Sequence, residues 1–143
     1  MNKALLTICN IKVGTYDVDF AGHVSNISYI RWLEDMRLQL FDSFFPLSNF
    51  INKGLVPVIA STKIDYKKPI RLFESPIGYM WIESLGAASI KISAYILVDS
   101  VITTQASHVA VFIDQSNGKP VKVPQEIVKA FINYKPIPGP IFF

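Results

Sequence analysis

Residues 16–29 read Tyr16-Asp17-Val18-Asp19-Phe20-Ala21-Gly22-His23-Val24-Ser25-Asn26-Ile27-Ser28-Tyr29. This stretch places a carboxylate a few residues before a glycine turn, and the turn leads into an amphipathic pattern. The start of a helix offers unpaired backbone N–H groups and a partial positive charge. Such donors can hold a carbonyl oxygen as it becomes an oxyanion, while a nearby acid supplies the nucleophile or the general base. The stretch therefore combines the parts of an acyl-transfer site.

A long helix follows the turn. From about Asn26 to Phe44, apolar residues recur at steps of three to four, which predicts an amphipathic helix. Ser25 or Asn26 is a competent N-cap, and Pro46 comes just after the last turn. Because the apolar face is broad, we expect the helix to be largely buried.

The rest of the chain favours strands. Alternating apolar residues predict strands at 5–15, 55–66, 77–82, 90–98 and 102–113, and a short helix at 125–131 follows Pro124. The proline-rich tail at 136–140 cannot form regular structure. Consecutive hairpins give an antiparallel sheet, and the long helix must pack on one of its faces. The predicted class is α+β, in one domain spanning residues 1–143.

Composition narrows the class of protein. Half of the 143 residues are hydrophobic, which argues against disorder. The mean hydropathy of +0.33 indicates that a partner subunit or an apolar ligand covers some of the apolar surface. A net charge of +3 without a basic run gives little support for nucleic-acid binding. Cys9 is the only cysteine, so an internal disulfide or a cysteine metal cluster is impossible. With neither a signal peptide nor an apolar run that could span a bilayer, we expect a cytoplasmic protein that does not insert into membranes.

The opening stretch also carries a resemblance. Asp17 to Tyr29, followed by Glu34 and Arg37, is similar to the signature Asp-x-Asp-x-x-Gly-His-Val-Asn-Asn-x-x-Tyr of the hotdog-fold acyl-CoA thioesterases of the 4-hydroxybenzoyl-CoA thioesterase type. Residues 64–70 resemble the tyrosine-to-proline strand end of that family, and residues 85–89 and 106–114 also fit. Ser25 departs from the signature, which usually has Asn there. Ala87-Ala88 stands where some relatives have a basic residue for CoA phosphate.

The resemblance implies a fold and a site. The fold would be a hotdog, an antiparallel sheet wrapped around one long central helix, assembled into homodimers or homotetramers with active sites at a dimer interface. Asp19 would be the catalytic carboxylate. The backbone N–H at Asn26 would polarise the thioester carbonyl, with Gly22, His23 and Val24 shaping the approach. No cofactor is implied, since CoA is part of the substrate.

Several of these residues also have simpler interpretations. Asp19 could be only a turn residue, and Asp17 fits a turn or cap. His23 fits a steric or hydrogen-bonding part in the pocket better than a catalytic proton role, and His108 is expected to be structural. Lys67, Lys68 and Arg71 could meet the phosphates of CoA, but lysines at strand ends also keep edges soluble.

Two other residue patterns bear on the chemistry. Glu34 and Arg37 are three apart on the predicted helix and can pair, either on its surface or as an internal clamp. The sequence contains no Gly-x-Ser-x-Gly elbow, no phosphate loop and no metal-ligand spacing.

The predicted function is hydrolysis of an acyl-CoA thioester to a carboxylic acid and free CoA. Asp19 would attack through water or directly on the carbonyl, and the sequence leaves both routes open. A second subunit would complete the pocket, because a single sheet and helix leave one face uncovered. The alternatives are an acyl-carrier-protein thioesterase and a non-catalytic acyl-binding hotdog module.

Overall fold

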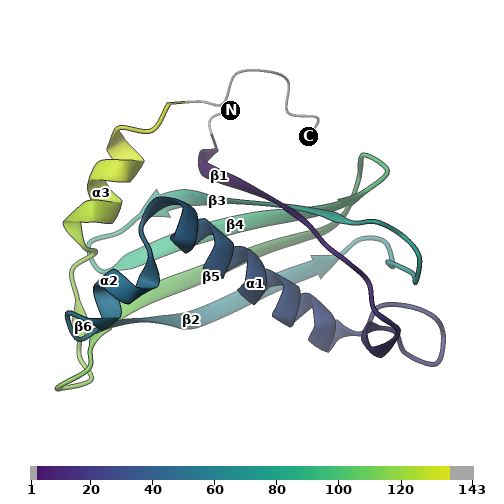
Figure 1. Ribbon diagram of the computed structural model, residues 1–143, viewed down its shortest axis with the longest axis horizontal. Helices are drawn as coiled ribbons and strands as arrows, with labels where there is room; N and C mark the ends of the chain where they lie inside the picture. Colours follow the sequence, from purple (N-terminus) through teal and green to yellow (C-terminus); the bar gives the residue numbers. More distant parts are fainter. Residues whose placement is uncertain (1–2, 136–143) are drawn as a thin grey trace.

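The computed structural model describes residues 3–135. Its elements in chain order are β1 (Ala4–Asn10), the short 3-10 turn η1 (Thr15–Asp17), α1 (Asn26–Phe44), α2 (Leu47–Ile51), β2 (Leu55–Tyr66), β3 (Ile77–Leu85), β4 (Ser89–Val98), β5 (Val101–Asp114), β6 (Pro120–Val121) and α3 (Gln125–Ile132). The strands form one antiparallel sheet in the order β1-β3-β4-β5-β2, with β6 paired to the end of β5. Figure 1 shows α1 lying along one face of this sheet. The predicted α+β class is confirmed.

Most predicted elements are found close to their expected bounds. The strand predicted at 55–66 has those bounds, and the long helix begins at Asn26 and ends at Phe44. The turn between β4 and β5 is tight because Asp99 and Ser100 both take positive φ, 49° and 65°, as a two-residue hairpin turn with a right-handed twist requires. The segment at 136–140, predicted to be irregular, lies outside the described residues.

The prediction of a strand over residues 5–15 was wrong in its second half. β1 ends at Asn10, and residues 15–17 form η1 instead. Ile11 and Val13 mimic a continuing strand because both pack against the core, but they do so from an irregular segment. The first strand is therefore short, and the chain turns early toward the start of α1.

The core lies between α1 and the sheet. Leu33, Met36 and Leu40 on the inner face of α1 are at most 1% exposed and pack with buried residues of the sheet such as Met80 and Ile92. Fully burying one such side chain contributes about 1.5–3 kcal/mol. This packing fixes α1 on the sheet and so fixes where its first turn lies.

The outer face of α1 is not covered, contrary to the expectation of a largely buried helix. Ile27, Ile30 and Leu38 are 66%, 48% and 44% exposed. They lie along one side of α1, since residues at these spacings share a helix face. β2 is the last strand in the sheet order, so one edge of β2 is unpaired within the described residues, and β2 residues line a cavity together with Leu38 of this stripe. Within residues 3–135, no helix has both the length and the apolar character needed to cross a bilayer.

Candidate active site

Asp19 is held in a turn by its own loop. Its Oδ1 accepts hydrogen bonds from the backbone N–H groups of Ala21 at 2.9 Å and His23 at 3.1 Å. The Asp19 N–H donates to the His23 carbonyl at 2.8 Å, and Gly22, at φ 81°, donates to the Asp19 carbonyl at 3.0 Å. Gly22 suits this position because left-handed backbone has little cost for glycine. These bonds fix the carboxylate through one oxygen and leave Oδ2 without a hydrogen bond to the described residues.

The turn leads directly into α1. The N–H groups of Val24 and Ser25 donate to the carbonyls of Ile70 and Asp17, both at 2.8 Å. Ser25 occupies the N-cap position, but its hydroxyl makes no capping bond. The next two amides, of Asn26 and Ile27, have no acceptor among the described residues, as is usual for the first turn of a helix. The first turn of α1 therefore has free N–H donors, and one of them belongs to Asn26, which lines a cavity together with Asp19.

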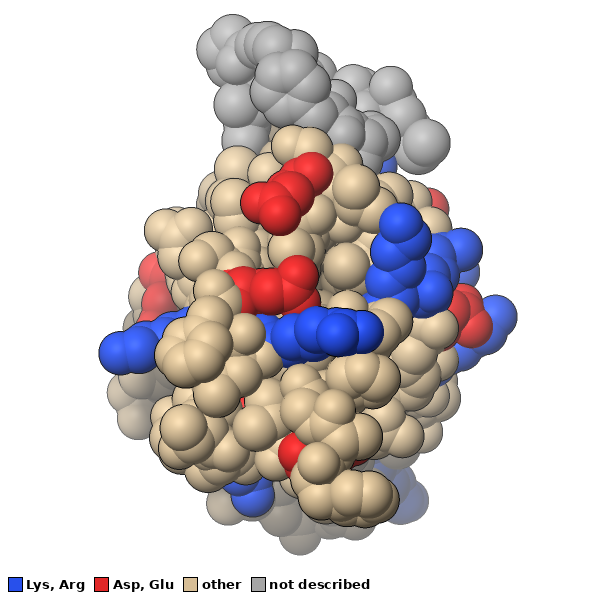
Figure 2. All heavy atoms as spheres, turned by 90° about the vertical axis from the view of Figure 1, so that its right-hand side faces the viewer, with Lys and Arg blue, Asp and Glu red and all other residues tan. Residues whose placement is uncertain are grey.

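An open cavity of about 370 Å³ is lined both by Asp19 and by Asn26, the first residue of α1. Its lining residues come from the 19–29 segment and from the end of β2, and they are Asp19, His23, Val24, Asn26, Tyr29, Tyr66, Lys67, Lys68 and Pro69. Figure 2 shows the end of the molecule that contains this region, where Lys, Arg, Asp and Glu side chains are interspersed with uncharged surface. Asp19 itself is exposed in the single chain.

Two tyrosines form a wall that the sequence analysis did not assign to the site. Tyr29 is 2% exposed and stands edge-on to Tyr66, with ring centroids 4.9 Å apart. Burial raises the pKa of the Tyr29 phenol, and the pKa of Tyr66 is raised by the same cause, so both remain neutral. Both tyrosines could have been recognised as site residues from the sequence. Tyr29 lies in the first turn of the helix, and Tyr66 immediately precedes Lys67-Lys68-Pro69.

Asp17 has a structural environment, as its interpretation as a turn or capping residue predicted. It is 4% exposed, and its Oδ2 accepts a hydrogen bond from the Gly14 N–H at 2.8 Å. Its Oδ1 accepts a hydrogen bond from the Ser28 hydroxyl, also at 2.8 Å. Asp17 thereby ties η1 to the first turn of α1 and helps to position the loop that carries Asp19.

The predicted basic cluster is only partly at the cavity. Lys67 and Lys68 line it, and their backbone N–H groups donate to the Thr103 carbonyl at 2.8 and 3.1 Å. Arg71 does not line the cavity, but its backbone forms an isolated β-bridge with His23. The structure therefore places all three cations at the same end of the molecule as Asp19.

Arg37 forms a hydrogen bond with His108, while Glu34 acts on it only through its charge, with no hydrogen bond or ion pair between the two among the described residues. An Nη of Arg37 lies 2.9 Å from Nδ1 of His108. Because Arg can only donate, Nδ1 accepts and the ring proton is on Nε2, which is buried without a partner among the described residues. Burial, with a smaller effect from Arg37, lowers the pKa of His108 to about 4. A neutral, 1% exposed His108 matches its predicted structural role.

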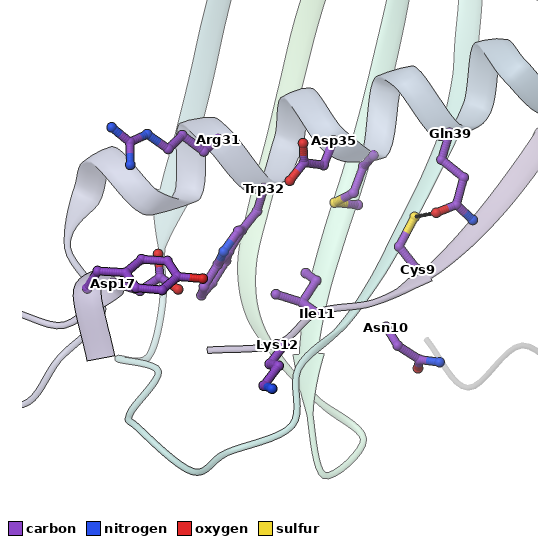
Figure 3. A pocket seen from close by; sticks show the side chains of 11 residues that line it. Cys9, Asn10, Ile11, Lys12, Asp17, Arg31, Trp32, Asp35 and Gln39 are labelled. Carbon is purple, nitrogen blue, oxygen red and sulfur yellow. Dashed lines mark hydrogen bonds between the residues drawn. The ribbon is translucent and has the colours of Figure 1, made fainter. Parts of the chain in front are cut away.

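A second cavity, of about 340 Å³, lies between α1 and the end of β1 (Figure 3). Arg31, Asp35 and Gln39 line it from the side of α1, and the Cys9 thiol donates a hydrogen bond to Oε1 of Gln39 at 3.0 Å. The amides of these helix residues belong to the interior of α1, where they bond to carbonyls four residues earlier. This cavity therefore offers no free helix amides for an oxyanion.

Sequence comparisons point to one family. Residues 13–131 match the sequence profile of the thioesterase-like superfamily. The chain is similar to a protein of Bacillus subtilis (strain 168) named "Putative acyl-CoA thioesterase YneP", with 28% identity over 116 residues, 78% of this chain and 83% of that protein. It is also similar to a "Putative esterase" of Aquifex aeolicus (strain VF5), with 25% identity over 119 residues, 82% of this chain and 91% of that protein.

Solved structures confirm the predicted hotdog fold. The DHNA-CoA thioesterase of Staphylococcus aureus superposes with a TM-score of 0.82 at 19% identity, over 89% of each chain. A thioesterase of Thermus thermophilus, solved in complex with coenzyme A and Zn, superposes with a TM-score of 0.78 at 21% identity, over 92% of this chain and 94% of that one. The match over residues 13–131 places the chain in the thioesterase-like superfamily, and it is a thioester hydrolase.

Proposed function

We propose that this protein hydrolyses acyl-CoA thioesters, with Asp19 as the catalytic carboxylate and the first turn of α1 as the oxyanion site. The observation that carries the proposal is the shared cavity of Asp19 and Asn26, in which a fixed carboxylate lies near unpaired helix amides. The similarity to the protein named acyl-CoA thioesterase and the neighbour solved with coenzyme A support CoA as the thiol.

The chemistry needs only the chain and water. In the general-base route, Asp19 takes a proton from water as the water oxygen bonds to the thioester carbon. The carbonyl oxygen becomes an oxyanion that the amide of Asn26, at the start of α1, stabilises. Collapse breaks the C–S bond, and the proton on Asp19 passes to the departing thiolate. His23, Gly22 and Val24 shape the approach to the carbon.

In the alternative route, a carboxylate oxygen of Asp19 attacks the carbon directly and CoA leaves before water enters. Water then hydrolyses the mixed anhydride. A single turnover in ¹⁸O-labelled water can reveal the anhydride route, because attack on the anhydride at the Asp19 carbonyl would leave label on Asp19. Label found only in the product acid is given both by general-base attack of water and by opening of the anhydride at the acyl carbon.

A second copy of the chain would complete the site. β2 has a free edge among the described residues, and the stripe of Ile27, Ile30 and Leu38 beside it is exposed. Exposed apolar surface beside an unpaired strand favours association. If two copies pair their β2 strands antiparallel, the Tyr66 end of one strand approaches the Pro57 end of the other. The cavity of Asp19 would then face the partner's copy of a cavity of about 290 Å³ that is lined by Arg37, Leu38 and Pro57, among others.

A thiol-release assay tests the proposed reaction. The full chain is incubated with short, long and aromatic acyl-CoAs and with the same acyl groups on acyl-carrier protein, and the free thiol is measured with a chromogenic disulfide. Steady release from at least one member of the panel is expected. Tight binding of acyl-CoA without release would favour the non-catalytic acyl-binding module, and release from acyl-carrier protein alone would favour the carrier-protein thioesterase.

A further inference from the structure

Phe73 occupies a backbone position that normally belongs to glycine. Its φ is 72°, in the left-handed region that bulky L-residues disfavour. Two hydrogen bonds hold the surrounding turn. The Glu74 N–H donates to the Arg71 carbonyl at 3.2 Å, and the Arg71 N–H donates to Oε1 of Glu74 at 2.6 Å. The turn therefore holds Phe73 in a strained conformation, and such strain gathers at functional sites.

The same residue is also displayed to solvent. Phe73 is 92% exposed, whereas its neighbour Leu72 packs against the cluster of Tyr29, Trp32 and Ile70. The turn thus buries the side chain of Leu72 and exposes that of Phe73 to solvent. Glycine at position 73 would remove both the backbone strain and the exposed ring, so the structure of the single chain gives no reason for a phenylalanine there.

The Phe73 turn lies beside the candidate active site. The Arg71 backbone bridges to His23, and the Val24 N–H donates to the Ile70 carbonyl. These contacts join the segment that follows β2 to the loop that carries Asp19. Phe73 therefore lies on the segment that adjoins the loop of Asp19 and that also supplies Lys67, Lys68 and Arg71.

An exposed aromatic ring next to several cations suits a ligand that joins a flat base to phosphates. Aromatic side chains stack on nucleobases regardless of base identity, and lysines and arginine pair with phosphate. We infer that Phe73 is a stacking platform for the adenine of CoA, with Lys67, Lys68 and Arg71 facing its phosphate groups. This inference rests on the proposed function and deepens it, because a pantetheine arm on a carrier protein has no adenine.

A second copy of the chain fits this surface less well. The segment from Lys67 to Glu74 carries three cations and one carboxylate. A two-fold contact through the turn would set these cations against themselves, which is unfavourable. The negatively charged phosphates of a nucleotide, in contrast, are complementary to these cations.

The test compares substrates that differ only in the nucleotide. Phe73→Gly and Phe73→Asn both accept positive φ without the ring, and Phe73→Tyr keeps the ring. For Phe73→Gly we expect a higher Tm, a KM for acyl-CoA raised about tenfold, and an unchanged KM for the same acyl group on pantetheine. Phe73→Asn should raise the acyl-CoA KM likewise, and Phe73→Tyr should keep the original value. Phe44→Ala, which removes a 42% exposed ring at the other end of α1, is the control and should leave both KM values unchanged.

Three results would overturn the inference. The first is an unchanged acyl-CoA KM in Phe73→Gly. The second is an equal rise of KM for both substrates, which would mean that the turn only positions the catalytic loop. The third is a change in association state without a change in KM, which would assign Phe73 to contact between copies. Calorimetry with adenosine 3′,5′-bisphosphate tests the platform without any turnover: binding that Phe73→Gly weakens supports it even if no thioester is hydrolysed, and no binding refutes it.

Discussion

Asp17 and Asp19 are two residues apart, yet their surroundings differ completely. Asp17 is buried and accepts hydrogen bonds from Gly14 and Ser28, whereas Asp19 is exposed and lines the cavity. The resemblance named the second of them as the catalytic residue. The structure gives a physical reason to separate them, since a carboxylate with both oxygens engaged by the protein is a poor base for substrate.

His108 should make the stability of the protein depend on pH. Its pKa is lowered from 6.5 to about 4 in the folded chain, so between these values the unfolded chain binds more protons. Stability is therefore fully present above the unfolded pKa and falls as the pH drops from 6.5 toward 4. The expected loss across this window is about 3 kcal/mol.

Urea unfolding across this pH range measures the loss. The matched variant is His108→Gln, whose side-chain oxygen can still accept a hydrogen bond from Arg37 but does not titrate. The variant should show a flatter pH dependence than the original chain. Parallel curves for the two proteins would mean that His108 does not titrate differently on folding.

At the scale of elements, long alternation and helical periodicity were easily recognised from the sequence. The bounds of β2 and α1 were predicted because each is a long, regular pattern ended by Pro, Gly or a turn. The end of β1 was not, since Ile11 and Val13 pack against the core without being in a strand. Apolar periodicity shows that a helix face is hydrophobic, but not whether the sheet of the same chain covers that face. The exposure of Ile30 to solvent was therefore not predicted.

Most of the residues that were named from the sequence and that line the cavity come from one contiguous stretch, and only Lys67 and Lys68 come from a separate cluster. Asp19, His23 and Asn26 lie within one stretch, and the structure brings them together with Lys67 and Lys68. The pairing of Arg37 with His108 joins residues 71 positions apart, and no local spacing signals it. The strain at Phe73 was equally hidden, because a positive φ at a residue other than glycine leaves no mark in the sequence.

The link between η1 and the start of α1 gives a stability prediction. Asp17→Ala would leave the Ser28 hydroxyl and the Gly14 amide without their carboxylate acceptor, and should lower the free energy of unfolding by about 2 kcal/mol. A double-mutant cycle with Ser28→Ala, measured by urea unfolding, isolates the contact between the two side chains. A coupling energy of at least about 0.5 kcal/mol is expected, whereas simple additivity would show that the contact contributes nothing.

At the scale of the whole molecule, the exposed stripe on α1 and the free edge of β2 together predict self-association. Ile30→Lys places a charge in the middle of the stripe and should shift the protein toward monomers, because burying an unpaired ammonium at an interface is strongly unfavourable. Light scattering coupled to size exclusion measures the mass, and thiol release should fall together with it. Ile132→Lys alters a 71% exposed residue on α3 and is the control. A chain that is monomeric and active before any substitution would exclude a shared site.

We expect the Asp19 carboxylate to drive thioester hydrolysis at the start of α1. Asp19→Asn tests it most directly, because the amide oxygen can still accept the hydrogen bonds from Ala21 and His23 while the charge is removed. The measurement is kcat for CoA release from the best acyl-CoA of the panel, with Tm measured on the same samples. The expected result is a fall in kcat of at least about a hundredfold with little change in Tm. Near-original kcat in Asp19→Asn would contradict it.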